Sequence, residues 1–218
     1  MAIEKIDIYF NSIAETYDKR MERPMTDEDG YVVRTVAEFP EQKNMRLLNL
    51  GCGTGMELLP LLERDDTLQI TGVDCADQML DKLKVNLAEY KNRVQTVCAD
   101  FFTADLGSDV YDGAMSVMAL HYYGHEEKLS LFKRVRTALK QKGFFILTDK
   151  FAPAQGYEDF CRSEVEKKKA EAHLPDGHYY CFAPLTIANE ASLLFKAGFS
   201  EVQVRWAKSN TAVLVAVK

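Results

Sequence analysis

The hydrophobic residues of the chain form two kinds of pattern, which alternate along most of its length. Short and nearly continuous apolar runs predict buried strands, and longer stretches with apolar residues at helical spacing predict amphipathic helices. The predicted strands cover 46–50, 68–74, 93–98, 111–118 and 143–149. The predicted helices between them lie near 55–64, 77–90 and 126–140. Strands that alternate with helices in this way form a parallel sheet covered on both faces.

The C-terminal part of the chain predicts a different connection. After a predicted helix at about 186–197, two β-rich runs, SEVQVRWA and NTAVLVAVK, are joined by a short polar turn at 208–210. A turn this short predicts an antiparallel hairpin at one edge of the sheet. The predicted fold class is therefore α/β, a Rossmann-like doubly wound sheet of seven strands, mostly parallel with an antiparallel C-terminal hairpin.

Two segments lie outside this alternation. Residues 1–45 carry apolar side chains at helical spacing from Ile6 to Tyr17 and a second predicted helix near 30–39. Residues 151–183 combine a charged helix with a turn-rich, aromatic segment that follows the end of a strand, where open α/β sheets bind ligands. We expect both to cover the site, although they could instead only shield hydrophobic edges. The predicted organisation is a single domain, 1–218, with an N-terminal helical cap (1–45), a cofactor-binding core (46–150), a cap insertion (151–183), and a last helix with the hairpin (184–218).

Composition and charge narrow the classes of function. The net charge of −6 argues against an extended nucleic-acid surface. There is no apolar run of about 18 residues that would span a membrane, and the charged N-terminus does not resemble a signal peptide. The five cysteines form no C-x-x-C pair, which favours free thiols over disulfides or zinc. These features predict a cytoplasmic enzyme without a membrane partner.

A glycine-rich turn follows the first predicted strand. Gly51, Gly53 and Gly55 leave room for a ligand to lie against the backbone at the start of a helix. A second strand ends on Asp74, where an acid can bind a ribose diol. Because Met56 replaces the last glycine of the dinucleotide fingerprint and no P-loop is present, the pattern indicates a different nucleoside-bearing cofactor.

The stretch Leu47–Gly55, LLNLGCGTG, resembles the first motif of the class I S-adenosylmethionine-dependent methyltransferases. The usual acid of that motif is Asn49 here. The resemblance continues in order through VDCADQML (73–80), CADFF (98–102), YDGAMSVMALHYY (111–123) and FKRVRTALKQKGFFILTD (132–149). It implies S-adenosylmethionine as the cofactor.

The resemblance also implies roles for individual residues. Asp74 would bind the ribose hydroxyls, and Asp100 and the backbone of Phe101 would bind the adenine. Tyr17 would cover the cofactor and Arg20 would reach its carboxylate, although Tyr17 could be an ordinary core residue and Arg20 a solvated one. The full set of predicted cofactor-binding residues is Tyr17, Arg20, Asn49, Gly51, Cys52, Gly53, Gly55, Asp74, Cys75, Met79, Asp100, Phe101 and Ser116.

Asn49 has a specific consequence for binding. The acid at this position in the family helps to organise the ammonium group of the cofactor's methionine part. Asparagine keeps an acceptor but loses the charge, so cofactor binding should weaken modestly unless another acid compensates.

Four histidines follow the fourth predicted strand, at positions 121, 125, 173 and 178. We expect His121 to polarise or deprotonate the methyl acceptor, with Tyr122 beside it, although His121 could equally serve packing. A metal site is disfavoured because Gly124 interrupts the helical spacing of His121 and His125. Methyl transfer itself requires mainly alignment of the acceptor with the methyl group, and a general base adds about 10²–10⁴-fold.

Three functions remain open. The favoured one is in-line methyl transfer to a small-molecule acceptor. The second is methylation of RNA or DNA, although residues 116–119 lack the [DNS]-P-P-[YFW] motif of base-amino methylation. The third is a non-catalytic, cofactor-binding protein on the same fold. The sequence leaves the acceptor, the methylated atom and the oligomeric state undetermined.

Overall fold

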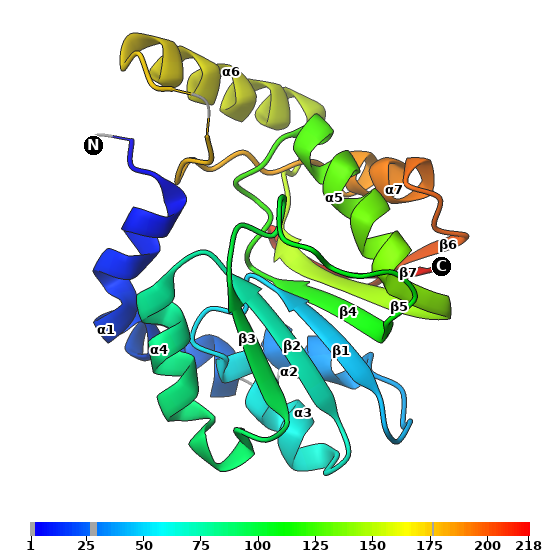
Figure 1. Ribbon diagram of the computed structural model, residues 1–218. Coiled ribbons are helices and arrows are strands. Elements are labelled where there is room, and N and C mark those ends of the chain that lie inside the picture. The colour runs from blue at the N-terminus through cyan, green and yellow to red at the C-terminus, as the bar shows by residue number, and fades with distance from the viewer. Residues whose placement is uncertain (1–2, 27–29, 176) are drawn as a thin grey trace.

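The computed structural model describes residues 3–26, 30–175 and 177–218. Its strands form one seven-stranded sheet in the order β3-β2-β1-β4-β5-β7-β6 (Figure 1). The strands are β1 (Arg46–Leu50), β2 (Gln69–Asp74), β3 (Val94–Cys98), β4 (Tyr111–Val117), β5 (Leu139–Lys150), β6 (Glu201–Lys208) and β7 (Thr211–Val217). Neighbours from β3 to β5 pair in parallel, and β7 runs antiparallel to both β5 and β6. The predicted fold class is confirmed.

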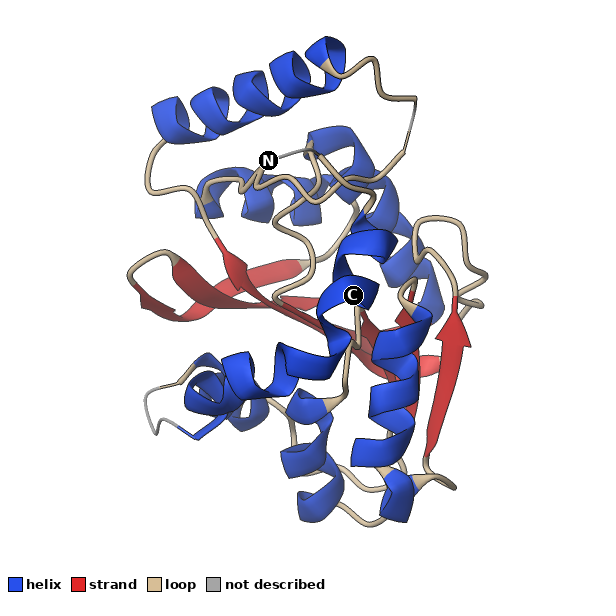
Figure 2. Cartoon of the chain, turned by 90° about the vertical axis from the view of Figure 1, so that its left-hand side faces the viewer, coloured by secondary structure: helices blue, strands red, loops and turns tan. Residues whose placement is uncertain are grey.

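Helices cover both faces of the sheet (Figure 2). Leu48 and Leu50 of β1 share one core with α5 and α7, while Leu47 points to the other face and packs with α3 and α4. This alternation along β1 is the period of two expected of a strand. The helices are α1 (Ile6–Thr26), α2 (Tyr31–Ala37), α3 (Leu59–Arg64), α4 (Asp77–Asn86), α5 (His125–Ala138), α6 (Gln155–Glu171) and α7 (Ile187–Lys196), with short 3₁₀ turns η1 (Met56–Leu58) and η2 (Ala88–Tyr90).

Two predicted boundaries differ from the structure. The helix predicted over 126–140 ends at Ala138, and β5 begins at Leu139 rather than at 143. Leu139 is fully buried and pairs with Tyr111 of β4, so tertiary pairing takes it into the sheet despite its helical spacing. The helix predicted over 55–64 opens as the 3₁₀ turn η1, because Pro60 occupies the first turn of α3 and provides no backbone donor.

The N-terminal helix and the cap insertion meet each other at the carboxyl edge of the sheet. Ile6 donates its backbone N–H to the carbonyl of His178 (3.1 Å), and Tyr180 donates to Glu4 (3.0 Å). The rings of Tyr9 and Tyr180 stack with centroids 3.4 Å apart. These two segments, far apart in the sequence, therefore form one cover, while α1 also lies beside α4 (Figure 1).

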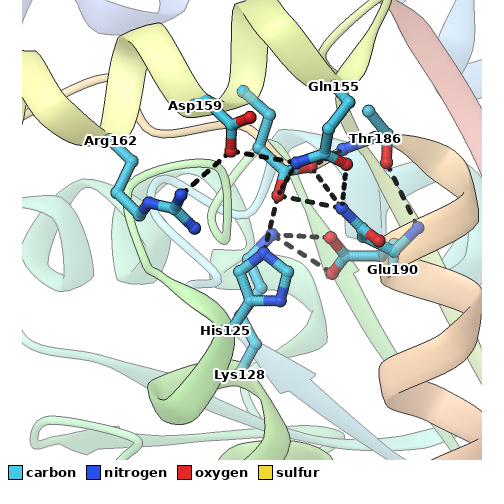
Figure 3. Close-up of polar contacts among 9 residues, drawn as sticks. His125, Lys128, Gln155, Asp159, Arg162, Thr186 and Glu190 are labelled. Carbon is cyan, nitrogen blue, oxygen red and sulfur yellow. Dashed lines mark hydrogen bonds and ion pairs between the residues drawn. The ribbon is translucent and has the colours of Figure 1, made fainter.

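A buried polar network attaches α6 to α5 and α7 (Figure 3). Glu158 of α6 accepts from His125 Nε2 (2.6 Å), from Asn189 Nδ2 (2.8 Å) and from the backbone N–H of Thr186 (2.6 Å). Next to it, Lys128 Nζ lies 2.8 Å from Glu190 Oε2, and both side chains are fully buried. The first turns of α6 are fixed in this way, and the rest of the helix projects at the top of the molecule (Figure 1).

None of the helices within the described ranges has the length and apolar character needed to cross a membrane.

Candidate cofactor and acceptor site

The glycine loop after β1 has the backbone conformation that its sequence predicts. Gly51, Gly53 and Gly55 have φ values of +70°, +47° and +74°, which disfavour other residues. A Cβ on Gly51 would lie 2.4 Å from Cβ of Ala119, so this glycine allows close approach to the loop after β4. A Cβ on Gly53 would meet no atom within 4 Å, because Gly53 faces an open hollow.

Asp74, at the end of β2, holds this loop. Its carboxylate accepts from the backbone N–H of Gly53 (2.8 Å) and of Ala76 (2.9 Å). Burial raises the pKa of Asp74, and these N–H groups oppose the rise. We call the space beside it the cofactor hollow, which is lined by Ile6, Phe10, Tyr17, Gly51, Gly53, Asp74, Cys75, Met79, Phe101, Val117, Met118, Ala119 and Tyr123.

Asp100 lines a neighbouring hollow at one end of the cofactor hollow. The two hollows share Cys75, Phe101 and Tyr123. It accepts from the N–H of Phe102 (2.8 Å) and from His178 Nδ1 (2.9 Å). Burial would raise the pKa of Asp100, but the hydrogen bond from His178 outweighs it and lowers the pKa. The predicted adenine acceptor is thus engaged by a residue of the cap.

Glu57 lies at the other end. Together with Tyr31 it lines a small hollow. This hollow shares Tyr17, Val117 and Met118 with the cofactor hollow. Asn49 Nδ2 donates to Glu57 Oε1 over 3.0 Å. Glu57 was not among the predicted site residues, since its approach to Asn49 depends on the 3₁₀ turn that follows the glycine loop.

Three predicted cofactor residues face the protein interior. Ser116 is fully buried and donates its hydroxyl to the Leu50 carbonyl (3.0 Å). Cys52 is fully buried in the core on the α3 and α4 face, where burial raises its pKa. A Cβ on Gly55 would lie 2.8 Å from Cγ of Leu83. These residues shape the loop and do not line the cofactor hollow.

A second space, the acceptor hollow, adjoins the first and has a volume of about 360 Å³. It shares Phe10, Tyr17 and Met118 with the cofactor hollow. Arg20 lines this hollow and not the cofactor hollow. Its full lining is Tyr9, Phe10, Ile13, Tyr17, Arg20, Tyr31, Met118, His121, Tyr122, Lys150 and Tyr180. Five tyrosines and two cations line it, and none of these described lining residues is acidic.

His121 and Asp149 form a buried pair on the wall of the acceptor hollow. The His121 Nδ1 atom is hydrogen-bonded to Asp149, whose other oxygen accepts from the N–H of Leu120 (2.8 Å). Burial would raise the pKa of Asp149, but the charge and hydrogen bond of His121 lower it. With Nδ1 engaged, Nε2 is the nitrogen of the neutral ring that can accept a proton. His121 was predicted from the sequence, whereas Asp149 was not, because its one signal was its place at a strand end.

Tyr122 lies against His121, with ring centroids 4.0 Å apart. Burial raises the pKa of Tyr122, so its hydroxyl remains protonated and can donate a hydrogen bond. His125 points to Glu158 instead of this hollow. Across the part of the chain that the structure describes, no three His, Cys, Asp or Glu side chains are grouped to hold a metal.

Known proteins resemble this chain in both sequence and fold. Residues 47–143, from the first motif into the first part of β5, match the family model of a methyltransferase domain. The chain therefore carries a methyltransferase domain and is similar over nearly its whole length to S-adenosylmethionine-dependent enzymes. The methyltransferase is 26% identical to the carboxy-S-adenosyl-L-methionine synthase of Nitratiruptor sp., over 99% of this chain and 95% of that protein.

Solved structures show the same fold. A Nostoc punctiforme protein described as a candidate O-methyltransferase has a TM-score of 0.72 and 22% identity, and the match covers 99% of the methyltransferase but only 62% of that protein. Human N-acetylserotonin methyltransferase in complex with S-adenosylmethionine has a TM-score of 0.66 and 16% identity, covering 96% and 58% of the two chains. At these identities the likeness concerns the fold alone.

The residues present fit S-adenosylmethionine as the cofactor. Gly53 opens onto the cofactor hollow, and Asp74, the predicted ribose acceptor, lines it. The Asn49 Oδ1 atom is a buried acceptor without a hydrogen-bond partner among the described residues. Asp100 and Glu57 lie at the two ends of the cofactor hollow and Asp74 lies between them. These three acids match a ligand with amino, ammonium and hydroxyl donors.

Proposed function

We propose that this methyltransferase transfers a methyl group to a small acceptor that must lose a proton, such as a hydroxylated aromatic compound. The observation that carries the proposal is the His121–Asp149 pair on the wall of a hollow next to the cofactor hollow. When bound, S-adenosylmethionine supplies an electrophilic methyl group. The roles below belong to the protein's own side chains.

His121 is the proposed general base. Its Nε2 atom takes the proton of the acceptor, and Asp149 fixes the ring tautomer and stabilises the imidazolium that forms. The aromatic side chains of Tyr9, Tyr122 and Tyr180 provide flat walls against which a ring can pack. The acceptor is thereby oriented before the proton is lost.

A small acceptor is favoured over nucleic acid. The acceptor hollow, at about 360 Å³, suits one compact molecule. Its lining comes from α1, α2 and Tyr180 together with the ends of β4 and β5. The net charge of −6 gives no general attraction for a phosphate backbone.

A second candidate function rests on the comparisons. The relatives that match nearly the whole chain are named carboxy-S-adenosyl-L-methionine synthases. A carboxylated cofactor would bring a new negative charge into the acceptor hollow, and Arg20 and Lys150 line that hollow. Arg20 and Lys150 could therefore pair with the carboxylate of such a product.

Native mass spectrometry tests the two candidates together. The purified protein is incubated with S-adenosylmethionine and, separately, a panel of phenols, amines, thiols and small carboxylic acids. Methyl transfer predicts S-adenosylhomocysteine and a methylated acceptor, while the second candidate predicts a bound cofactor heavier by one carbon dioxide unit. Binding of S-adenosylmethionine without either product from any class would support the non-catalytic function and contradict the proposal.

A further inference from the structure

The acid missing from position 49 has a neighbour that can replace it. Asn49 is fully buried, and its Nδ2 atom donates to Glu57 Oε1 over 3.0 Å. When Glu57 is ionised, its carboxylate can only accept from the amide, so the Asn49 nitrogen is the atom that faces it. The remaining atom, Oδ1, is buried and has no hydrogen-bond partner within the described residues.

Glu57 itself lacks a cation. Among the described residues, no Lys, Arg or His side chain forms an ion pair with it, and Asn49 is its hydrogen-bonding side chain. Burial raises the pKa of Glu57 to about 7, the bond from Asn49 lowers it, and the nearby charges of Asp74 and Asp18 raise it further. A carboxylate in this setting gains most from a positively charged hydrogen-bond donor.

Asp18 of α1 adds to the same negative environment. Its Oδ2 atom accepts from Asn86 Nδ2 over 3.0 Å, while its buried Oδ1 atom has no partner in the described chain. The neighbourhood therefore combines two carboxylates and an unpaired amide oxygen. All are acceptors, so the missing group is a donor with several hydrogens.

The position of Glu57 indicates which donor this is. The hollow that it lines joins the cofactor hollow through Tyr17, Val117 and Met118, at the end away from Asp100. With the adenine toward Asp100 and the ribose at Asp74, the amino-acid part of the cofactor extends toward Glu57. That part carries a primary ammonium group, which has three N–H donors.

We propose that Glu57 and Asn49 form an ammonium-binding subsite that receives the α-ammonium group of the cofactor's methionine part. The negative charge comes from Glu57 in the 3₁₀ turn after the glycine loop, instead of from an acid in strand β1. Asn49 orients the Glu57 carboxylate and offers its own Oδ1 atom as a second acceptor for the ammonium group. This inference rests on S-adenosylmethionine being the cofactor.

The test is calorimetric titration with two ligands that differ only at the ammonium group. One is S-adenosylhomocysteine, and the other is its deaminated analogue, which keeps the carboxylate. Glu57→Gln is expected to weaken S-adenosylhomocysteine binding about 10–100-fold, as for loss of a charge-assisted bond, and to leave the analogue unchanged. Glu63→Gln, an exposed acid on α3, is the matched control and should change neither.

A double variant sharpens the result. Asn49→Asp combined with Glu57→Gln returns an acid to the family's usual position and should recover most of the lost affinity for S-adenosylhomocysteine. Equal weakening of both ligands by Glu57→Gln, or no weakening of either, would overturn the subsite. Failure of the wild type to bind either ligand would instead contradict the cofactor assignment.

A measurement on the wild type keeps the test decisive if Glu57→Gln does not fold. Titrations at pH 6 in buffers of different ionisation enthalpy count the protons released on binding. S-adenosylhomocysteine is expected to release close to one proton more than its deaminated analogue, because the ammonium group ionises Glu57. Equal proton release for the two ligands would contradict the proposal.

Discussion

Two carboxylates near the centre of this methyltransferase differ in their partners and in the direction in which their pKa values are shifted. Asp149 backs the acceptor hollow, and Glu57 lines the hollow at the methionine end; the two hollows share Tyr17, Tyr31 and Met118. Asp149 is paired with His121 and its pKa is lowered. Among the described residues, Glu57 is bonded to the neutral donor Asn49 and has no cation beside it, and its pKa is raised to about 7.

The difference separates a carboxylate that already has a side-chain partner able to carry positive charge from one that would need a ligand to supply it. A buried carboxylate with an internal partner is a fixed part of the protein and can position the group it holds. A partly buried carboxylate without a cation is destabilising until a ligand supplies one. On this argument Asp149 belongs to the chemistry and Glu57 to binding.

Asp149→Asn gives the largest expected effect on turnover. The variant keeps an acceptor near His121 but removes the charge that fixes the ring, so kcat should fall about 10²–10⁴-fold, measured as S-adenosylhomocysteine formation with an acceptor from the panel. Cofactor affinity should stay at the wild-type value. Asp66→Asn, an exposed acid before β2, is the control, and an Asp149→Asn enzyme with unchanged kcat would remove His121 from the proposed role.

Lys128→Met tests what happens when a balanced carboxylate loses its partner. Glu190 would remain fully buried without a cation, and the free energy of unfolding should fall by about 3–5 kcal/mol in denaturant titrations. The double variant Lys128→Met/Glu190→Leu should regain most of that loss. If the single and double variants were equally unstable, the loss would come from packing and not from an unpaired charge.

Some of the acids of the site were predicted from the sequence and others were missed. The strands, the glycine loop and Asp74 follow local patterns, so their places were predictable to within a few residues. The partnership of His121 with Asp149 joins the ends of β4 and β5, and that of Asp100 with His178 joins the core to the cap. Such contacts depend on tertiary packing. Glu57 was missed because its meeting with Asn49 depends on the course of η1, although the absent acid at position 49 was a signal to look for another.

The pH dependence of stability should reveal the unpaired state of Glu57. Its pKa is higher in the folded protein, about 7, than the ordinary value of 4.5, so the folded state holds the proton more tightly. The contribution of Glu57 to the free energy of unfolding is therefore largest below about pH 4.5. This contribution falls by about 1–3 kcal/mol as the pH rises to about 7. Comparison of Glu57→Gln with the wild type by denaturant titration isolates this contribution. Saturating S-adenosylhomocysteine should flatten the difference, and identical pH profiles without ligand would contradict the raised pKa.

His178→Asn gives the smallest expected effect and tests the other end of the cofactor hollow. Its hydrogen bond to Asp100 raises the pKa of His178, and the nearby Glu127 acts in the same direction while Lys169 opposes it. This pair therefore stabilises the cap fully below the ordinary histidine pKa of about 6.5, and the contribution is lost as the pH rises through the higher pKa of the folded state. Because Asp100 is partly exposed to solvent, the contribution should not exceed about 1 kcal/mol. Hydrogen exchange at the N–H groups of Ile6 and Tyr180, which join α1 to the cap, should be faster in the variant at pH 6 and closer to the wild type at pH 9. Equal exchange at pH 6 would mean that the stacked Tyr9 and Tyr180 rings, and not the charge at Asp100, hold the cover closed.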